Sequence, residues 1–76
     1  MDNKDYITVG EITKQAGITR QGVYYYEDKG LIKPVMLAGR LRLYSRDTIT
    51  LIKKIQELKE TYKLEAIKKM IEEGKI

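Results

Sequence analysis

The residues best suited to specific contacts lie in one short stretch, which begins at Thr19 and continues with Arg20 and Gln21. An arginine guanidinium pairs with two acceptors on guanine, and a glutamine amide pairs with adenine in the same bidentate way. Tyr24 and Tyr25 follow in the next helical turn, where phenol hydroxyls can donate to phosphate oxygens. This combination predicts a surface that binds double-stranded DNA.

The distribution of positive charge supports the same chemistry. The net charge of the chain is +4, and all four arginines lie in residues 1–46. Arg40 and Arg42 alternate with leucine in a short stretch with strand-like period. Arginine is the side chain that forks onto phosphates and bases, so we expect both of these residues to bind DNA.

The chain lacks the residue types and motifs that most enzymes use for catalysis. The chain has no Cys and no His, which removes disulfides, zinc sites and catalysis by Ser-His or Cys-His pairs. It shows no carboxylate pair beside a nucleophile and no glycine-rich phosphate loop. We therefore expect no enzyme activity, no metal and no cofactor.

Length and composition predict a single globular domain over residues 1–76. Hydrophobic residues make up 42% and charged residues 34% of the chain, which is a folded rather than a disordered balance. No apolar run approaches the roughly 18 residues of a membrane span, and the polar residues 1–5 argue against a signal peptide. The expected location is the cytoplasm, in association with the nucleoid.

Two helices joined by a tight turn are predicted to carry the candidate contact residues. Thr8 and Glu11 form a capping box, which starts a helix that ends at Ala16 before Gly17. A second helix starts after the cap residue Thr19. Together these elements form a helix-turn-helix over about residues 8–29, whose second helix enters the major groove of DNA.

The second helix has one buried and one exposed face. Val23 and Tyr26 share the inward face, because they are three positions apart. Successive helical positions turn by about 100°, so Tyr26 is expected to be buried and at least one of Tyr24 and Tyr25 to be exposed. Gly22 weakens the helix, and we expect its missing side chain to permit close approach to DNA.

The rest of the chain is predicted to form a wing and two further helices. Pro34 breaks helical structure, and residues 32–44 are expected to form a β-hairpin wing. A third helix over about 46–61, capped by Ser45, carries an apolar stripe that includes Tyr62. A fourth helix covers about 64–73. The predicted fold class is therefore mainly α, a winged helix-turn-helix with a small β-hairpin wing and two further helices.

With these parts assembled, the chain resembles the DNA-binding domain of the MerR family of bacterial regulators over about residues 6–73. The stretches that carry the resemblance are ITVGEI (7–12), AGIT (16–19), YYEDKGLI (25–32) and RLYS (42–45). The resemblance implies that the second helix reads the major groove and that the wing holds the flanking backbone. It also implies DNA contacts from Thr19, Arg20, Gln21, Tyr24, Tyr25, Arg40 and Arg42.

The chain departs from the family pattern in three ways. Tyr24 stands where the family commonly has an arginine, which weakens the contribution of charge. Gly22 stands where the family has a larger polar residue. The long dimerisation helix and effector domain of full-length regulators are absent, so the chain is expected to be either a fragment or a small stand-alone protein, monomeric in isolation and dimeric or arranged head to tail on DNA.

The preferred interpretation is sequence-specific binding of double-stranded DNA by a bacterial transcriptional regulator. The alternative is a stand-alone architectural protein, similar to an excisionase or to a plasmid or phage partition protein, which binds head to tail on repeats. A protein-interaction module built on the helical scaffold is a third hypothesis.

Overall fold

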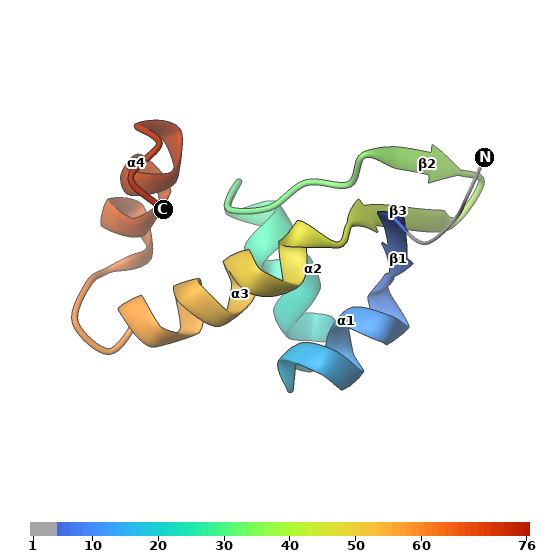
Figure 1. The fold of residues 1–76 in the computed structure, drawn as a ribbon, viewed down its shortest axis with the longest axis horizontal. Coiled ribbons are helices and arrows are strands. Elements are labelled where there is room, and N and C mark those ends of the chain that lie inside the picture. Colours follow the sequence, from blue (N-terminus) through green and yellow to red (C-terminus); the bar gives the residue numbers. More distant parts are fainter. Residues whose placement is uncertain (1–4) are drawn as a thin grey trace.

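A computed structural model describes residues 5–76, which form four helices and three short strands (Figure 1). Residues 1–4, part of the polar stretch that argued against a signal peptide, lie outside the described residues. The predicted winged helix-turn-helix is confirmed. Its elements, in chain order, are β1 (Tyr6–Thr8), α1 (Val9–Ala16), α2 (Arg20–Asp28), β2 (Met36–Ala38), β3 (Leu41–Ser45), α3 (Asp47–Leu58) and α4 (Leu64–Glu72).

The wing is part of a three-stranded antiparallel sheet in the order β1-β3-β2. The hairpin of β2 and β3 was predicted, but β1 was not. β1 pairs Ile7 with Tyr44, and both side chains are 0% exposed. A strand of three residues is too short to show a period in sequence, and its pairing with β3 joins the wing to the start of α1.

The caps of α1 are those that the sequence predicted. The N–H of Glu11 donates to Thr8 Oγ1 at 3.2 Å, and the N–H of Thr8 donates to Glu11 Oε1 at 3.2 Å. At the other end, Gly17 has φ 65 and ψ 37, and its N–H donates to the carbonyl of Thr13 at 3.1 Å. The turn between the two helices therefore contains Gly17 in the left-handed conformation, which glycine adopts without steric cost.

The end of α2 is closed by a Schellman pattern. Gly30, which has φ 78, donates to the carbonyl of Glu27 at 3.0 Å, and the N–H of Leu31 donates to the carbonyl of Tyr26 at 2.9 Å. Such a motif commonly carries an apolar contact across the helix end, and both Leu31 and Tyr26 are buried. The chain thus leaves α2 in a defined direction toward the wing.

One core cluster joins all the helices to the sheet. Its members are buried apolar side chains, and Leu51, Leu58, Leu64 and Ile71 pack against them from the periphery. The buried members are Ile7, Val9, Ile12, Val23, Tyr26, Leu31, Ile32, Tyr44, Ile49, Ile52, Ile55 and Ile67.

Two details predicted for α3 are wrong. Ser45 does not cap the helix, because it is the last residue of β3 and pairs with Tyr6; the cap position falls on Arg46. The helix also ends at Leu58 rather than at residue 61. The N–H groups of Thr61 and Tyr62 both turn back to the carbonyl of Leu58, so Tyr62 leaves the apolar stripe and is 45% exposed.

The sheet and α4 lie at opposite ends of the longest axis, and α3 runs between them (Figure 1). Ile67 of α4 is 0% exposed. The side chain of Lys68 lies within 3.1 Å of the Cβ position of Gly30. The fourth helix is thus placed against the end of α2, away from the wing.

Gly17→Ala tests the turn of the helix-turn-helix. An added Cβ at residue 17 meets nothing within 4 Å, so the whole cost comes from the left-handed backbone. We expect a loss of about 1–2 kcal/mol in the free energy of unfolding, measured by urea denaturation. Gly17→Asn, which tolerates positive φ better, should lose less. Unchanged stability of the alanine variant would contradict this account.

Candidate nucleic-acid interface

The three consecutive tyrosines of α2 divide between the core and the surface. Val23 and Tyr26 are 0% and 3% exposed, whereas Tyr24 and Tyr25 are 43% and 47% exposed. The prediction that Tyr26 is buried and that a neighbour is exposed is confirmed. The inward pair holds α2 against the core, and this leaves Tyr24 and Tyr25 at the surface.

The first turn of α2 is also exposed. Thr19 Oγ1 accepts a hydrogen bond from the N–H of Gly22 at 3.0 Å, so the Thr19 side chain caps the helix. Arg20 and Gln21 are the first two residues after this cap, and both are exposed. The geometry therefore presents a guanidinium and an amide at the N-terminal end of the second helix.

Gly22 has a packing role that the sequence did not indicate. A Cβ at this position would lie 2.6 Å from Ile18 Cγ1, which is closer than van der Waals contact allows. The side of α2 at residue 22 thus faces Ile18, which packs against the core from the turn. The missing side chain makes room for Ile18.

Arg40 lies at the tip of the wing. Ala38 pairs with Leu41, which leaves a two-residue loop of Gly39 and Arg40. A type II′ hairpin turn requires a positive φ at the first of its two loop residues only. Gly39, the first, has a φ of 63°, and Arg40, the second, does not have a positive φ. The arginine is exposed at the tip, where a long side chain can reach the sugar-phosphate backbone of a nucleic acid beside the protein.

Three arginines from three parts of the chain meet around one small hollow. Its volume is about 160 Å³, and it lies where the wing approaches the start of α1. Arg20 reaches back over that start, since Arg20 Nη2 lies 3.4 Å from the Cβ position of Gly10. The N-terminus of a helix carries partial positive charge and unpaired N–H groups. The hollow is lined by Thr8, Val9, Gly10, Arg20, Tyr24, Arg40, Leu41 and Arg42.

Arg42 is held by two side chains of α2. Its Nη1 lies 3.3 Å from Glu27 Oε2, and its guanidinium lies over the ring of Tyr24, 5.6 Å from the ring centroid. The same carboxylate accepts a hydrogen bond from the hydroxyl of Tyr44. Glu27 therefore joins α2 to β3 through two side chains of the strand.

Tyr44 remains a hydrogen-bond donor in this network. Burial and the hydrogen bond to Glu27 both raise the pKa of the Tyr44 hydroxyl well above its usual value, against a smaller opposing effect of Arg42. Removing the proton would place a second negative charge in the core beside the carboxylate. The contact between wing and helix thus depends on a protonated phenol.

Two interface residues had not been singled out from the sequence. Lys29 Nζ lies 5.5 Å from the ring centroid of Tyr25, which adds a cation beside that exposed phenol. Glu27 follows Tyr24 by three positions, and residues so spaced share a helix face. That spacing could have indicated that Glu27 lies on the same face as Tyr24. It could not have indicated the partners of Glu27 on β3, which lie 15 and 17 positions further along the chain.

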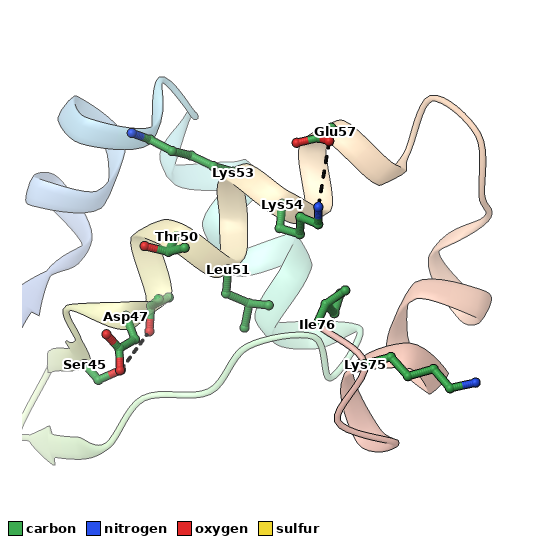
Figure 2. Close-up of a pocket in the computed structure, with 10 residues that line it drawn as sticks. Ser45, Asp47, Thr50, Leu51, Lys53, Lys54, Glu57, Lys75 and Ile76 are labelled. Carbon is green, nitrogen blue, oxygen red and sulfur yellow. Dashed lines mark hydrogen bonds and ion pairs between the residues drawn. The ribbon is translucent and has the colours of Figure 1, made fainter.

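A larger hollow lies elsewhere and contains none of the predicted contact residues (Figure 2). Its volume is about 690 Å³, and it lies between α3 and the last residues of the chain. Leu51, Lys75 and Ile76 are among the residues that line it (Figure 2). Lys54 pairs with Glu57 across 3.8 Å at its rim, so charges of both signs surround this hollow.

Within residues 5–76, no three acidic side chains lie close enough together to hold a metal ion. None of the helices described in this range is both long enough and apolar enough to cross a membrane.

Comparison with known proteins finds transcriptional regulators among the relatives of this chain. The family described as MerR HTH family regulatory protein matches residues 7–74. The chain is 42% identical over 43 residues to the HTH-type transcriptional activator SoxR homolog of Chromobacterium violaceum, a match that covers 57% of this chain and 29% of that protein. It is 32% identical over 57 residues to the HTH-type transcriptional regulator YfmP of Bacillus subtilis strain 168, a match that covers 74% of this chain and 41% of that protein. The chain therefore spans less than half the length of these relatives.

Tyr44→Phe tests the buried phenol. In the native state the proton is held more tightly than in the unfolded chain, where the pKa is about 10. The wild-type free energy of unfolding should therefore fall as the pH rises above about 10, by up to about 1.4 kcal/mol per pH unit from this one group. Denaturation at several pH values should show that this part of the decline is absent from Tyr44→Phe.

The matched control is Tyr62→Phe, which removes a phenol from an exposed turn and should keep the wild-type decline. Identical pH profiles for Tyr44→Phe and the wild type would contradict the assignment.

Proposed function

This chain belongs to the MerR HTH family of regulatory proteins, and from that membership and its surface we propose that it binds double-stranded DNA sequence-specifically to regulate transcription. The observation that carries the proposal is the meeting of Arg20, Arg40 and Arg42 around one hollow at the start of α1. These cations lie beside the exposed first turn of α2, which is the part of a helix-turn-helix that meets base edges. The activity is binding, with no chemical step.

In this proposal α2 is the recognition helix and enters the major groove. Arg20 and Gln21 lie in its first turn, where a guanidinium can fork onto guanine and an amide onto adenine. Thr19 lies at the same end of the helix, and its hydroxyl can donate to a phosphate while its oxygen caps the helix. The first turn therefore supplies both base and backbone contacts.

The backbone contacts come from side chains that flank this turn. Tyr24 and Tyr25 are exposed on α2, and their hydroxyls can donate to phosphate oxygens. Arg40 at the wing tip and Arg42 beside Tyr24 supply positive charge on the other side of the hollow. The wing would thus hold the backbone that borders the groove read by α2.

A second function is favoured by the apolar surface of the wing. Val35, Met36, Leu37 and Leu41 are 54%, 46%, 64% and 48% exposed. β2 is also an edge strand, and an exposed apolar edge is a site for pairing with another chain. These features fit a stand-alone architectural protein whose copies bind side by side on repeated sites.

Selection from a pool of random duplex DNA by the purified chain, followed by sequencing, tests the proposal. Enrichment of a defined sequence is the expected result. An inverted repeat would indicate a dimer on DNA, a single short site would indicate a monomer, and direct repeats bound cooperatively would favour the architectural function. With about four to six phosphates neutralised, the log–log dependence of affinity on salt should have a slope of roughly −4 to −5. No enrichment and no DNA retained at low salt would overturn the proposal and favour a protein-interaction module.

Arg20→Ala separates base contact from backbone contact. A lost base contact should cost about 1–3 kcal/mol on the selected duplex and much less on a scrambled duplex, as measured by titration of both. Lys75→Ala removes one positive charge far from the wing and is the matched control, with a small and equal effect on both duplexes. An equal, large loss on both duplexes for Arg20→Ala would assign Arg20 to phosphate, together with Arg40 and Arg42.

A further inference from the structure

Glu27 places a negative charge on the surface that the proposed function turns toward DNA. Its side chain is 23% exposed and pairs with Arg42, whose guanidinium lies over the Tyr24 ring. A carboxylate near phosphates opposes binding through like-charge repulsion. A residue that serves only the electrostatics of this surface would therefore not be acidic, and Glu27 needs another role.

The contacts of Glu27 define that role. Oε2 holds the guanidinium of Arg42 at 3.3 Å, and Oε1 accepts the hydroxyl of Tyr44, whose ring is 0% exposed. One anchor is thus in the core and the other is at the surface. Because Glu27 is on α2 and both partners are on β3, the carboxylate sets the position of the wing relative to the recognition helix.

The same network positions an exposed aromatic ring. The Arg42 guanidinium lies 5.6 Å from the centroid of the Tyr24 ring, and cation–π attraction favours that arrangement. A guanidinium without its carboxylate partner would be free to sample many rotamers, since arginine has high side-chain entropy. The orientation of Tyr24 therefore depends on Glu27 through Arg42.

We infer that Glu27 is a positioning residue for DNA recognition, which fixes Arg42 and Tyr24 so that wing and recognition helix meet the duplex in one register. This inference rests on the proposed function. According to this inference Glu27 increases the discrimination between DNA sequences, although its negative charge lowers the affinity for DNA of any sequence.

Glu27→Gln tests this inference. Glutamine keeps the size of the side chain and an oxygen for Tyr44, but it loses the charge that holds Arg42. We expect affinity for the selected duplex to fall about tenfold, the size of one lost bidentate base contact. Affinity for a scrambled duplex should be unchanged or higher, because a negative charge has been removed.

The matched control is Glu57→Gln, which removes the same charge and breaks the Lys54–Glu57 ion pair on α3. It should leave discrimination between the two duplexes within about twofold of the wild type. Nuclear Overhauser contacts between the Arg42 side chain and the Tyr24 ring supply a second readout in the free protein. They should be present in the wild type and in Glu57→Gln and lost in Glu27→Gln.

A further variant covers the case in which Glu27→Gln does not fold, as judged by circular dichroism. Arg42→Lys keeps the positive charge but loses the planar guanidinium that pairs with Glu27 and lies over the Tyr24 ring, and it should lose discrimination in the same way. Wild-type protein that binds no duplex would overturn the proposed function itself. Wild-type discrimination that persists in Glu27→Gln, or in Arg42→Lys where Glu27→Gln is unfolded, would overturn the inference and leave the proposed function standing.

Discussion

The position of the wing depends on one carboxylate that joins two elements distant in sequence. Glu27 accepts the hydroxyl of the buried Tyr44 and pairs with Arg42 at the surface. A hydrogen bond to a charged group is stronger than one between neutral groups, and leaving it unmade in the core is costly. The contact is therefore a strong constraint on how β3 lies against α2, and a small domain has few such constraints.

The core stabilises the same arrangement by packing alone. Tyr44 pairs with Ile7 across the sheet, and Val23 and Tyr26 bring α2 to the same cluster. Strand β1 leads directly into α1, so the start of that helix is fixed beside the wing. These contacts fix α2, β3 and the start of α1 relative to one another. Arg20, Arg40 and Arg42 therefore come together around one hollow.

Arginine is concentrated on the same part of the molecule. Three of the four arginines line the hollow and come from α2, the hairpin turn and β3, whereas the lysines and glutamates of α3 and α4 are mixed in sequence. On those helices pairs such as Lys54 and Glu57 offset each other at the surface. The proposed interface thus differs from the rest of the described surface in the kind of cation and in its geometry, more than in total charge.

The sequence by itself determined the local structure. Capping residues Thr8, Glu11 and Thr19, together with Gly17, predict where α1 begins and ends and where α2 begins, because these signals act within one helical turn. Helical spacing also predicted that Tyr26 is buried beside exposed tyrosines. Most of the fold and the exposed members of the candidate site could be predicted in this way.

Only the tertiary structure decided which distant residues meet. Strand β1, which forms by pairing with β3, and the pairing of Glu27 with Arg42 and Tyr44 of β3 could not be predicted from the sequence pattern. Each depends on a contact between segments that the chain brings together only after the core has packed. Local propensity carries no information on such contacts, since their stability comes from burial and hydrogen bonding between elements rather than within them.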